Sequence, residues 1–262
     1  MTQVLAGRVA LVTGVGRRRG IGFAIAKRLA AQGADLFTAG HAPYDASQPW
    51  GADPDRDALV AELRAAGHRV LHAEADLADP AAPARLVEDA RRQLGHVDVL
   101  VANHAHSGSG ALEDLRAEDI DRHLHVNVRA TLLLAQAFAA QHEAERAGGR
   151  VIWMISGQHR SAMPGELAYV ASKGALIGMA HTLAVGLGGD GIAVTAVAPG
   201  LTHTPASVNV PVEAFADVEA HQALARPLTP DDTAAVVAML ARDDAAALTG
   251  QTLVADGGLV LG

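Results

Sequence analysis

The sequence has no cysteine, few aromatic residues and no excess of basic charge, and each of these absences excludes a class of protein. Without cysteine, the 262-residue chain can form neither disulfides nor thiolate metal sites, which is compatible with a reducing cytoplasm. The 29 acidic residues outnumber the 21 lysines and arginines, whereas a nucleic-acid-binding protein usually carries a basic face. We therefore expect no nucleic-acid partner.

Long apolar runs are also absent. No segment stays apolar over the roughly 20 residues that a membrane-spanning helix needs, and the first residues lack the basic-then-apolar order of a signal peptide. These features predict a cytoplasmic protein with no membrane partner. We expect no catalytic metal either. His104 and His106 are two residues apart, as are His123 and His125. Side chains at this spacing on a helix do not share a face, so neither pair is suited to hold a metal ion.

Apolar residues, mainly Ala, Val and Leu, make up 50% of the chain. Short apolar runs that predict strands alternate with segments of helical spacing. The predicted strands are 9–12, 36–39, 69–73, 97–102, 151–155, 192–197 and 251–254, and the predicted helices are 21–31, 57–66, 80–94, 118–146, a helix carrying 169–187, and 230–242. This alternation predicts one α/β domain over residues 1–262, a Rossmann-type doubly wound parallel sheet with helices on both faces.

Two segments depart from this alternation. Residues 41–57 are rich in Pro, Asp, Ser and Gly, and we interpret them as a surface insertion. Residues 204–227 are helical in composition but are interrupted by Pro205 and Pro211. This second segment is either a mobile flap over a site or an ordinary loop.

A glycine-rich turn joins the first predicted strand to the first helix. It reads Thr13-Gly14-Val15-Gly16-Arg17-Arg18-Arg19-Gly20-Ile21-Gly22. Glycines let the backbone approach a pyrophosphate closely, and the helix that follows offers free N–H groups and the positive end of its dipole. The order strand, turn, helix therefore predicts a dinucleotide site.

The same region predicts NADP rather than NAD. NAD binding usually needs an acidic residue at the end of the second strand, and here the chain continues through His41 with no carboxylate until Asp45. Three consecutive arginines, Arg17, Arg18 and Arg19, could bind the 2′-phosphate of NADP. The alternative is that all three face solvent and His41 or backbone donors bind the phosphate.

The candidate catalytic residues are Tyr169 and Lys173, with Ser156 thirteen positions before the tyrosine. A four-residue spacing places the phenol and the ammonium on one face of a helix. A cation beside a phenol lowers the tyrosine pKa, and a tyrosine tuned in this way can exchange a proton with a carbonyl or alcohol oxygen.

Together these motifs resemble those of the classical short-chain dehydrogenases/reductases over nearly the whole chain. The further matching segments are Asp76-Leu77, Asn103-His104-Ala105, Asn127 and Pro199-Gly200-Leu201-Thr202-His203-Thr204. His104 departs from the family's small residue at that position. The resemblance implies an NAD(P)-dependent oxidoreductase, a dimer or tetramer, in which Asn127, Ser156, Tyr169 and Lys173 are catalytic.

The resemblance also implies roles for individual residues. Ser156 polarises the substrate carbonyl, Lys173 holds the nicotinamide ribose, and Asn127 holds a water that links Lys173 to solvent. Cofactor contacts are expected from Gly14, Gly16, Arg17, Arg18, Arg19, Gly20, Ile21, Gly22, His41, Asp76, Leu77, Asn103, His104, Ala105, Tyr169, Lys173, Pro199, Gly200, Thr202 and Thr204.

The glycine-rich turn is two residues longer than the family's usual form. Enoyl-acyl carrier protein reductases show a similar lengthening but use a wider spacing from tyrosine to lysine, so we place carbonyl reduction first. A 3-oxoacyl thioester or a polyketide-type ketone is the leading substrate hypothesis. A sugar or steroid is the alternative substrate, and an NADP-sensing regulator without turnover is the alternative function.

Overall fold

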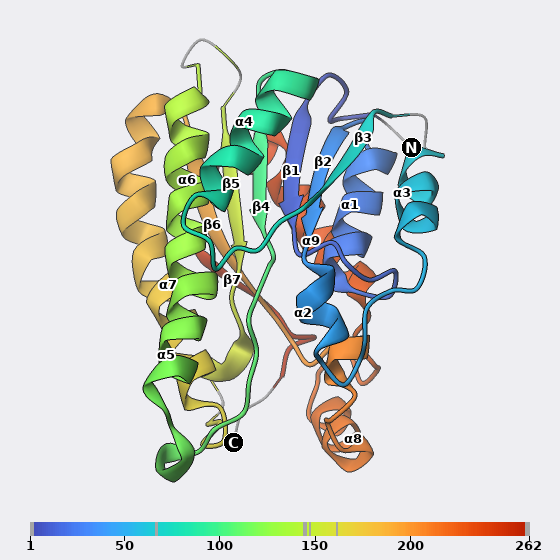
Figure 1. Cartoon of the computed structure of the whole chain (residues 1–262), viewed down its shortest axis with the longest axis vertical. Coiled ribbons are helices and arrows are strands. Elements are labelled where there is room, and N and C mark those ends of the chain that lie inside the picture. Colours follow the sequence, from blue (N-terminus) through green and yellow to red (C-terminus); the bar gives the residue numbers. More distant parts are fainter. Residues whose placement is uncertain (1–2, 66–67, 144–145, 147, 161, 260–262) are drawn as a thin grey trace.

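The protein forms a seven-stranded parallel sheet covered by helices on both faces (Figure 1). The computed structural model describes residues 3–65, 68–143, 146, 148–160 and 162–259. Its strands are β1 (Val9–Thr13), β2 (Asp35–Gly40), β3 (Val70–Glu74), β4 (Val99–Ala102), β5 (Arg150–Met154), β6 (Ala193–Pro199) and β7 (Thr252–Ala255). Their order in the sheet is β3-β2-β1-β4-β5-β6-β7. The predicted Rossmann-type fold is confirmed.

Two apolar layers sandwich the sheet. One cluster packs α1 (Ile21–Ala31), α3 (Arg56–Arg64) and α9 (Pro230–Leu240) against one face of the sheet. The other packs α4 (Ala82–Leu94), α6 (Ala130–Gln141) and α7 (Leu167–Leu187) against the opposite face. Every residue of β1 is buried, as expected for a strand covered on both sides.

The order of the strands indicates where in the fold a ligand site is expected. The chain reverses direction across the sheet between β1 and β4, which are hydrogen-bonded neighbours. In open parallel sheets, ligands bind at the carboxyl ends of the strands beside such a reversal. Helices α2 (Ala42–Ala46) and α8 (Val212–Ala220) lie at this edge, in the lower half of Figure 1.

Two predicted segments differ from the structure. The insertion 41–57 contains α2, which begins with Pro43 in its first turn, a position where proline suits a helix because no N–H is needed there. The single helix predicted over 118–146 is instead α5 (Ala117–His123), a π-helical turn (Leu124–Arg129) and α6. Within 204–227 the chain forms a short 3₁₀ turn (Pro205–Ser207) and then α8.

Helix α7 departs from the expectation that no segment is long and apolar enough to span a membrane. Residues Leu167–Asp190 could cross a membrane by length and composition, with a mean hydropathy of 1.3 and 28% of that window buried. The helix packs against β6, and it carries Lys173 on its buried side. It therefore belongs to the layer that covers the sheet, at the left of Figure 1.

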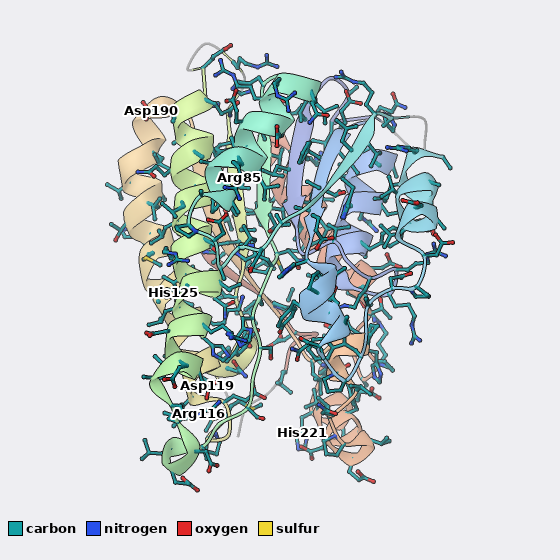
Figure 2. The ribbon with its side chains drawn as sticks, in the orientation of Figure 1. Arg85, Arg116, Asp119, His125, Asp190 and His221 are labelled. Atoms are coloured by element: carbon teal, nitrogen blue, oxygen red, sulfur yellow. The ribbon has the colours of Figure 1, made fainter. Side chains whose placement is uncertain are left out.

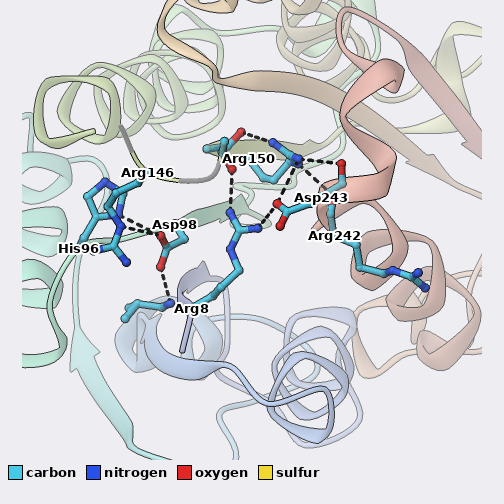
Figure 3. Close-up of polar contacts among 10 residues, drawn as sticks. Arg8, His96, Asp98, Arg146, Arg150, Arg242 and Asp243 are labelled. Carbon is cyan, nitrogen blue, oxygen red and sulfur yellow. Dashed lines mark hydrogen bonds and ion pairs between the residues drawn. The ribbon is translucent and has the colours of Figure 1, made fainter. Parts of the chain in front are cut away.

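A network of charged residues ties together the opposite, amino-terminal edge of the sheet (Figure 3). The buried Asp98 accepts hydrogen bonds from the backbone of Val9 at 2.8 Å and from the His96 ring at 3.0 Å, and Arg146 lies 3.5 Å away. Nearby, Arg8 and Arg150 both bind Asp243. These contacts hold the starts of β1, β4 and β5 together.

We expect Asp98→Ala to destabilise the fold, because it leaves the Val9 amide and the His96 ring without their buried acceptor. An unsatisfied buried donor costs about 1–3 kcal/mol. The measurement is the free energy of unfolding in denaturant. Asp89→Ala is the control, since Asp89 on α4 has a side chain that is 42% exposed and that pairs with Arg92 at the surface. Equal unfolding midpoints for the two variants would contradict this account of the network.

Candidate active site

A groove runs along the carboxyl ends of the strands and collects most of the predicted site residues. The predicted residues that line it are Gly14, Gly16, Arg17, Gly20, Ile21, Gly22, His41, Asn103, His104, Ala105, Tyr169, Lys173, Pro199 and Thr204. They come from the ends of β1, β2, β4 and β6 and from α1 and α7. The fold thus brings together segments that are up to 190 positions apart in the chain (14 to 204).

The glycine-rich turn leaves no room for side chains at three positions. A Cβ at Gly22 would lie 2.3 Å from the Gly14 carbonyl oxygen, and one at Gly16 would lie 2.4 Å from a carboxylate oxygen of Asp45. Gly14 has a φ of 72°, in the left-handed region. Gly20 caps α1 without a side-chain hydrogen bond, and the start of the helix, Gly20 to Gly22, lines the groove. This cradle fits a pyrophosphate.

Tyr169 and Lys173 lie on the inner side of α7, with Lys173 buried. The Lys173 ammonium donates a hydrogen bond to the Met154 carbonyl at 2.8 Å and lies 5.6 Å from the centre of the Tyr169 ring. Burial lowers the pKa of Lys173 to about 8. The ammonium is therefore tied to the end of β5, above the ring of the tyrosine.

The expected lowering of the tyrosine pKa is not found. Burial, and then the negative charge of Glu166, raise the pKa of Tyr169 above its ordinary value. Burial of the phenol, which the sequence does not reveal, has a larger effect than the neighbouring cation. A phenol with a raised pKa keeps its proton, which suits the donation of a proton to a developing alkoxide.

Ser156 and Asn127 hold the loops on either side of this pair. Ser156 caps the 3₁₀ turn Gly157–His159, where its hydroxyl accepts a hydrogen bond from the Gln158 amide at 3.3 Å. Asn127 is fully buried in the π-helical turn; its side chain accepts from the backbone N–H of His106 at 2.7 Å and donates to the Ser172 hydroxyl at 2.9 Å. The amide side chain therefore positions the loop after β4 against α7.

Known proteins are similar to this chain in both sequence and architecture. Residues 14–260 match the family described as enoyl-(acyl carrier protein) reductase. A short-chain dehydrogenase from Burkholderia cenocepacia, solved in complex with NADP, superposes with a TM-score of 0.84 at 36% identity, over 97% of this chain and 98% of that one. The chain belongs to the short-chain dehydrogenase/reductase family. It is accordingly an oxidoreductase.

Two further members of the family are similar over almost their full lengths. One is the (2S)-[(R)-hydroxy(phenyl)methyl]succinyl-CoA dehydrogenase subunit BbsD of Thauera aromatica, 35% identical over 96% of both chains. The other is a blue fluorescent protein from a metagenomic library, solved in complex with NADPH, with a TM-score of 0.85 and 37% identity over 98% of this chain and 99% of that one.

The three arginines of this short-chain dehydrogenase/reductase point to different places. Only Arg17 lines the groove. Arg18 pairs with Glu62 at 3.4 Å, and Arg18 and Arg19 line a separate hollow outside α1 together with Lys27. The expectation that Arg18 and Arg19 contact the cofactor therefore has no support from the groove, and Arg17 is the arginine available to a 2′-phosphate.

Four other predicted cofactor contacts lie beside the groove rather than in it. Asp76 and Leu77 line an adjoining hollow that also contains His41 and Ala105. Gly200 is packed, because a Cβ there would lie 2.7 Å from the Asp256 backbone. Thr202 is buried and donates a hydrogen bond back to the Gly200 carbonyl at 2.8 Å. Gly200 and Thr202 thus shape the turn after β6.

His104, where the family has a small residue, serves this reductase as a structural tie. Its Nδ1 accepts from the Thr13 hydroxyl at 2.7 Å, and its Nε2–H donates to the Val126 carbonyl at 3.0 Å. Burial, and then the Lys173 charge, lower its pKa to about 3, so the ring is neutral. It connects the ends of β1 and β4 to the π-helical turn.

The histidine pairs do not form a metal site in the part of the chain described above. No three His, Asp or Glu side chains there are arranged to hold a metal ion. His123 is buried, whereas His125 is exposed on the next turn (Figure 2). Glu166 lies near Tyr169 and accepts a hydrogen bond from Gln158 at 2.6 Å. The side chain of His159 lies outside the described parts.

The sequence analysis missed several groove residues, chiefly Tyr44, Asp45 and Trp50 on the insertion and Ser107 after β4. The Tyr44 hydroxyl accepts a hydrogen bond from the Ser107 amide at 2.9 Å, so α2 reaches from the β2 side of the groove to the β4 side. The available signal was the pair Ala42-Pro43, which is typical of a helix start. A short helix there returns Asp45 to the glycine-rich turn.

Proposed function

We propose that this protein interconverts a ketone and a secondary alcohol with NADP(H). The observation that carries the proposal is the Tyr169–Lys173 pair on α7, which opens into the same groove as the glycine cradle. A bound nicotinamide cofactor supplies or accepts the hydride. The protein supplies position, polarity and a proton.

Each residue then has a defined task. Tyr169 gives its proton to the substrate oxygen during reduction and takes it back during oxidation. Ser156, at the end of β5, donates a hydrogen bond that polarises the carbonyl. Lys173, fixed by the Met154 carbonyl, places its positive charge beside the Tyr169 ring and binds the ribose of the cofactor.

A 3-oxoacyl thioester or a polyketide-type ketone is the proposed substrate. The Thauera relative is named as a dehydrogenase of a CoA thioester, and the matching family is described as a reductase of acyl carrier protein substrates, which favours thioesters over sugars or steroids. The test is a panel of thioester, sugar and steroid ketones assayed with NADPH and with NADH. Cofactor binding without turnover of any of them would favour the regulator instead.

NADP is the proposed cofactor because Arg17 lines the groove and because solved relatives bind NADP and NADPH. We expect Arg17→Gln to lower the NADPH-to-NADH ratio of kcat/KM at least about tenfold, since a charge-assisted hydrogen bond to phosphate contributes about 1.5–3 kcal/mol. Arg19→Gln is the matched control, and its ratio should stay unchanged. A wild-type preference for NADH would overturn the cofactor assignment.

We also propose a cytoplasmic homo-oligomer, a dimer or tetramer. The outer face of α7 carries no Asp, Glu, Lys or Arg and exposes Ala171, Gly174, Gly178, His181 and Val185. Small uncharged residues over this length allow a second copy to approach closely. Sedimentation should find more than one chain per particle, and Val185→Glu should lower that number.

A further inference from the structure

We infer that Asp45 is a cofactor-specificity residue that opposes Arg17 and limits the enzyme's preference for NADP over NAD. The inference rests on the proposed use of a nicotinamide dinucleotide. In NAD-binding proteins the acidic residue usually stands at the end of the second strand, and β2 ends here without one. The carboxylate comes instead from α2, five positions beyond Gly40, the last residue of β2.

The first support is the way in which the carboxylate is held. Asp45 is 7% exposed. Its Oδ1 accepts hydrogen bonds from Arg17 at 2.6 Å and from the Trp50 indole at 3.2 Å. The Arg17 guanidinium also lies 5.1 Å from the centre of the Trp50 ring. The cation that could bind a 2′-phosphate is therefore already paired with a nearly buried anion.

The second support is the position of the other carboxylate oxygen. Oδ2 lies against Gly16, so closely that a Cβ on that glycine would be 2.4 Å away. No residue in the described part of the chain donates a hydrogen bond to Oδ2, and Asp45 lines the groove. An acceptor with negative charge thus faces the groove at the glycine-rich turn.

NAD and NADP differ in how they interact with a carboxylate at this position. A ribose hydroxyl is a donor and can bond to a carboxylate oxygen, which is how acidic residues select NAD. A 2′-phosphate brings about two negative charges and only acceptors, so it is repelled by Oδ2 and must compete with Asp45 for Arg17. Asp45 therefore favours NAD at the expense of NADP.

The carboxylate cannot easily turn away. Helix α2 is anchored on one side by the bond from the Ala42 amide to Glu74 at 2.6 Å, and on the other by Tyr44 and Ser107. The Tyr44 and Trp50 rings also meet edge to face at 6.3 Å. These contacts keep Asp45 over Gly16, so its charge acts at a fixed place.

Asp45→Asn tests the inference, because it keeps the shape and removes the charge. The probes are adenosine 2′,5′-bisphosphate and 5′-AMP, which carry only the adenosine end of the cofactor, and binding is measured by calorimetry. We expect the variant to bind the bisphosphate about tenfold more tightly and 5′-AMP no more tightly, since one charge-assisted contact changes affinity by about this factor. The NADPH-to-NADH ratio of kcat/KM should rise in parallel.

Asp53→Asn is the matched control. It removes the same charge from the same insertion, but Asp53 bonds to the backbone of Arg18 and Asp55 rather than to Arg17. Its ratio of affinities for the two probes should equal that of the wild type. Weaker binding of the bisphosphate by Asp45→Asn would overturn the inference, because Asp45 would then serve to orient Arg17 for phosphate. An unchanged ratio would overturn it as well.

Failure of the inference and failure of the proposed function are distinguishable. If the wild type binds neither probe nor either dinucleotide, the proposed function is wrong and the inference falls with it. If the dinucleotides bind and ketones are reduced while Asp45→Asn leaves the ratio unchanged, only the inference is wrong. Thermal unfolding of the variant shows whether a loss of binding comes from a loss of fold.

Discussion

Tyr169→Phe should lower kcat for ketone reduction by about 10²–10⁴-fold, the usual loss when a general acid is removed. The variant keeps the aromatic ring that packs over Lys173 and loses only the hydroxyl proton. The burial that raises the pKa of Tyr169 keeps that proton on the phenol at neutral pH, so the wild type holds an acid at this place that the Phe variant lacks.

The affinity of Tyr169→Phe for NADPH is the control that shows whether the substitution leaves the groove intact. Because the hydroxyl acts on the substrate, the Kd for NADPH should stay close to the wild-type value. Near-normal turnover by Tyr169→Phe would exclude the tyrosine as the acid. A large loss of NADPH binding would instead show that the substitution disturbs the groove, and the kinetic result could then not be assigned to proton transfer.

Lys173→Met should lower both kcat and the affinity for NADPH, because one ammonium serves the phenol and the ribose side of the groove. In the wild type, kcat/KM should fall as the pH rises through about 8, the pKa to which burial lowers Lys173, since the neutral amine has lost its charge. The Met variant should lack this limb of the pH profile. If kcat/KM of the variant still falls near pH 8, the fall must be assigned to another titrating group.

The same substitution should change how stability depends on pH. The pKa of Lys173 is about 8 in the folded protein and about 10.4 in an unfolded chain. Between these values the unfolded chain binds more protons, so this lysine makes the wild type more stable as the pH rises through that window. Below pH 8 the buried charge is a penalty of about 3 kcal/mol. Lys173→Met should remove this penalty, and its free energy of unfolding should no longer rise with pH in that window.

The topology and the placement of Tyr169 beside Lys173 could be predicted from the sequence because both follow from local patterns. Short apolar strands alternate with helical spacing, and only a few arrangements of such units are stable. The pair Tyr169 and Lys173 needs only the four-residue spacing of a helix to share a face. For the same reason the glycine-rich turn was recognisable without any knowledge of its neighbours.

The charges around the cofactor groove could not be predicted in this way, because they depend on packing between distant segments. In the sequence, Asp45 is the first carboxylate after β2, and it was not among the predicted cofactor contacts. The turn of α2 returns it to Gly16, where it meets Arg17. Likewise, the sequence places Lys173 near Tyr169 but does not reveal that Lys173 is buried and that the half-buried Tyr169 loses much of its hydration. This desolvation determines the direction of each pKa shift.

The amino ends of the central strands stabilise the fold and the carboxyl ends line the groove. This separation affects how the protein can evolve. At the amino ends, Asp98 and its partners join β1, β4 and β5, while the glycine cradle and Tyr169 lie at the carboxyl ends. A five-residue strand such as β1 spans about 16 Å, and substitutions that far apart usually have additive effects. Mutations that adapt the groove to a new substrate can therefore accumulate while the anchored edge continues to maintain the fold.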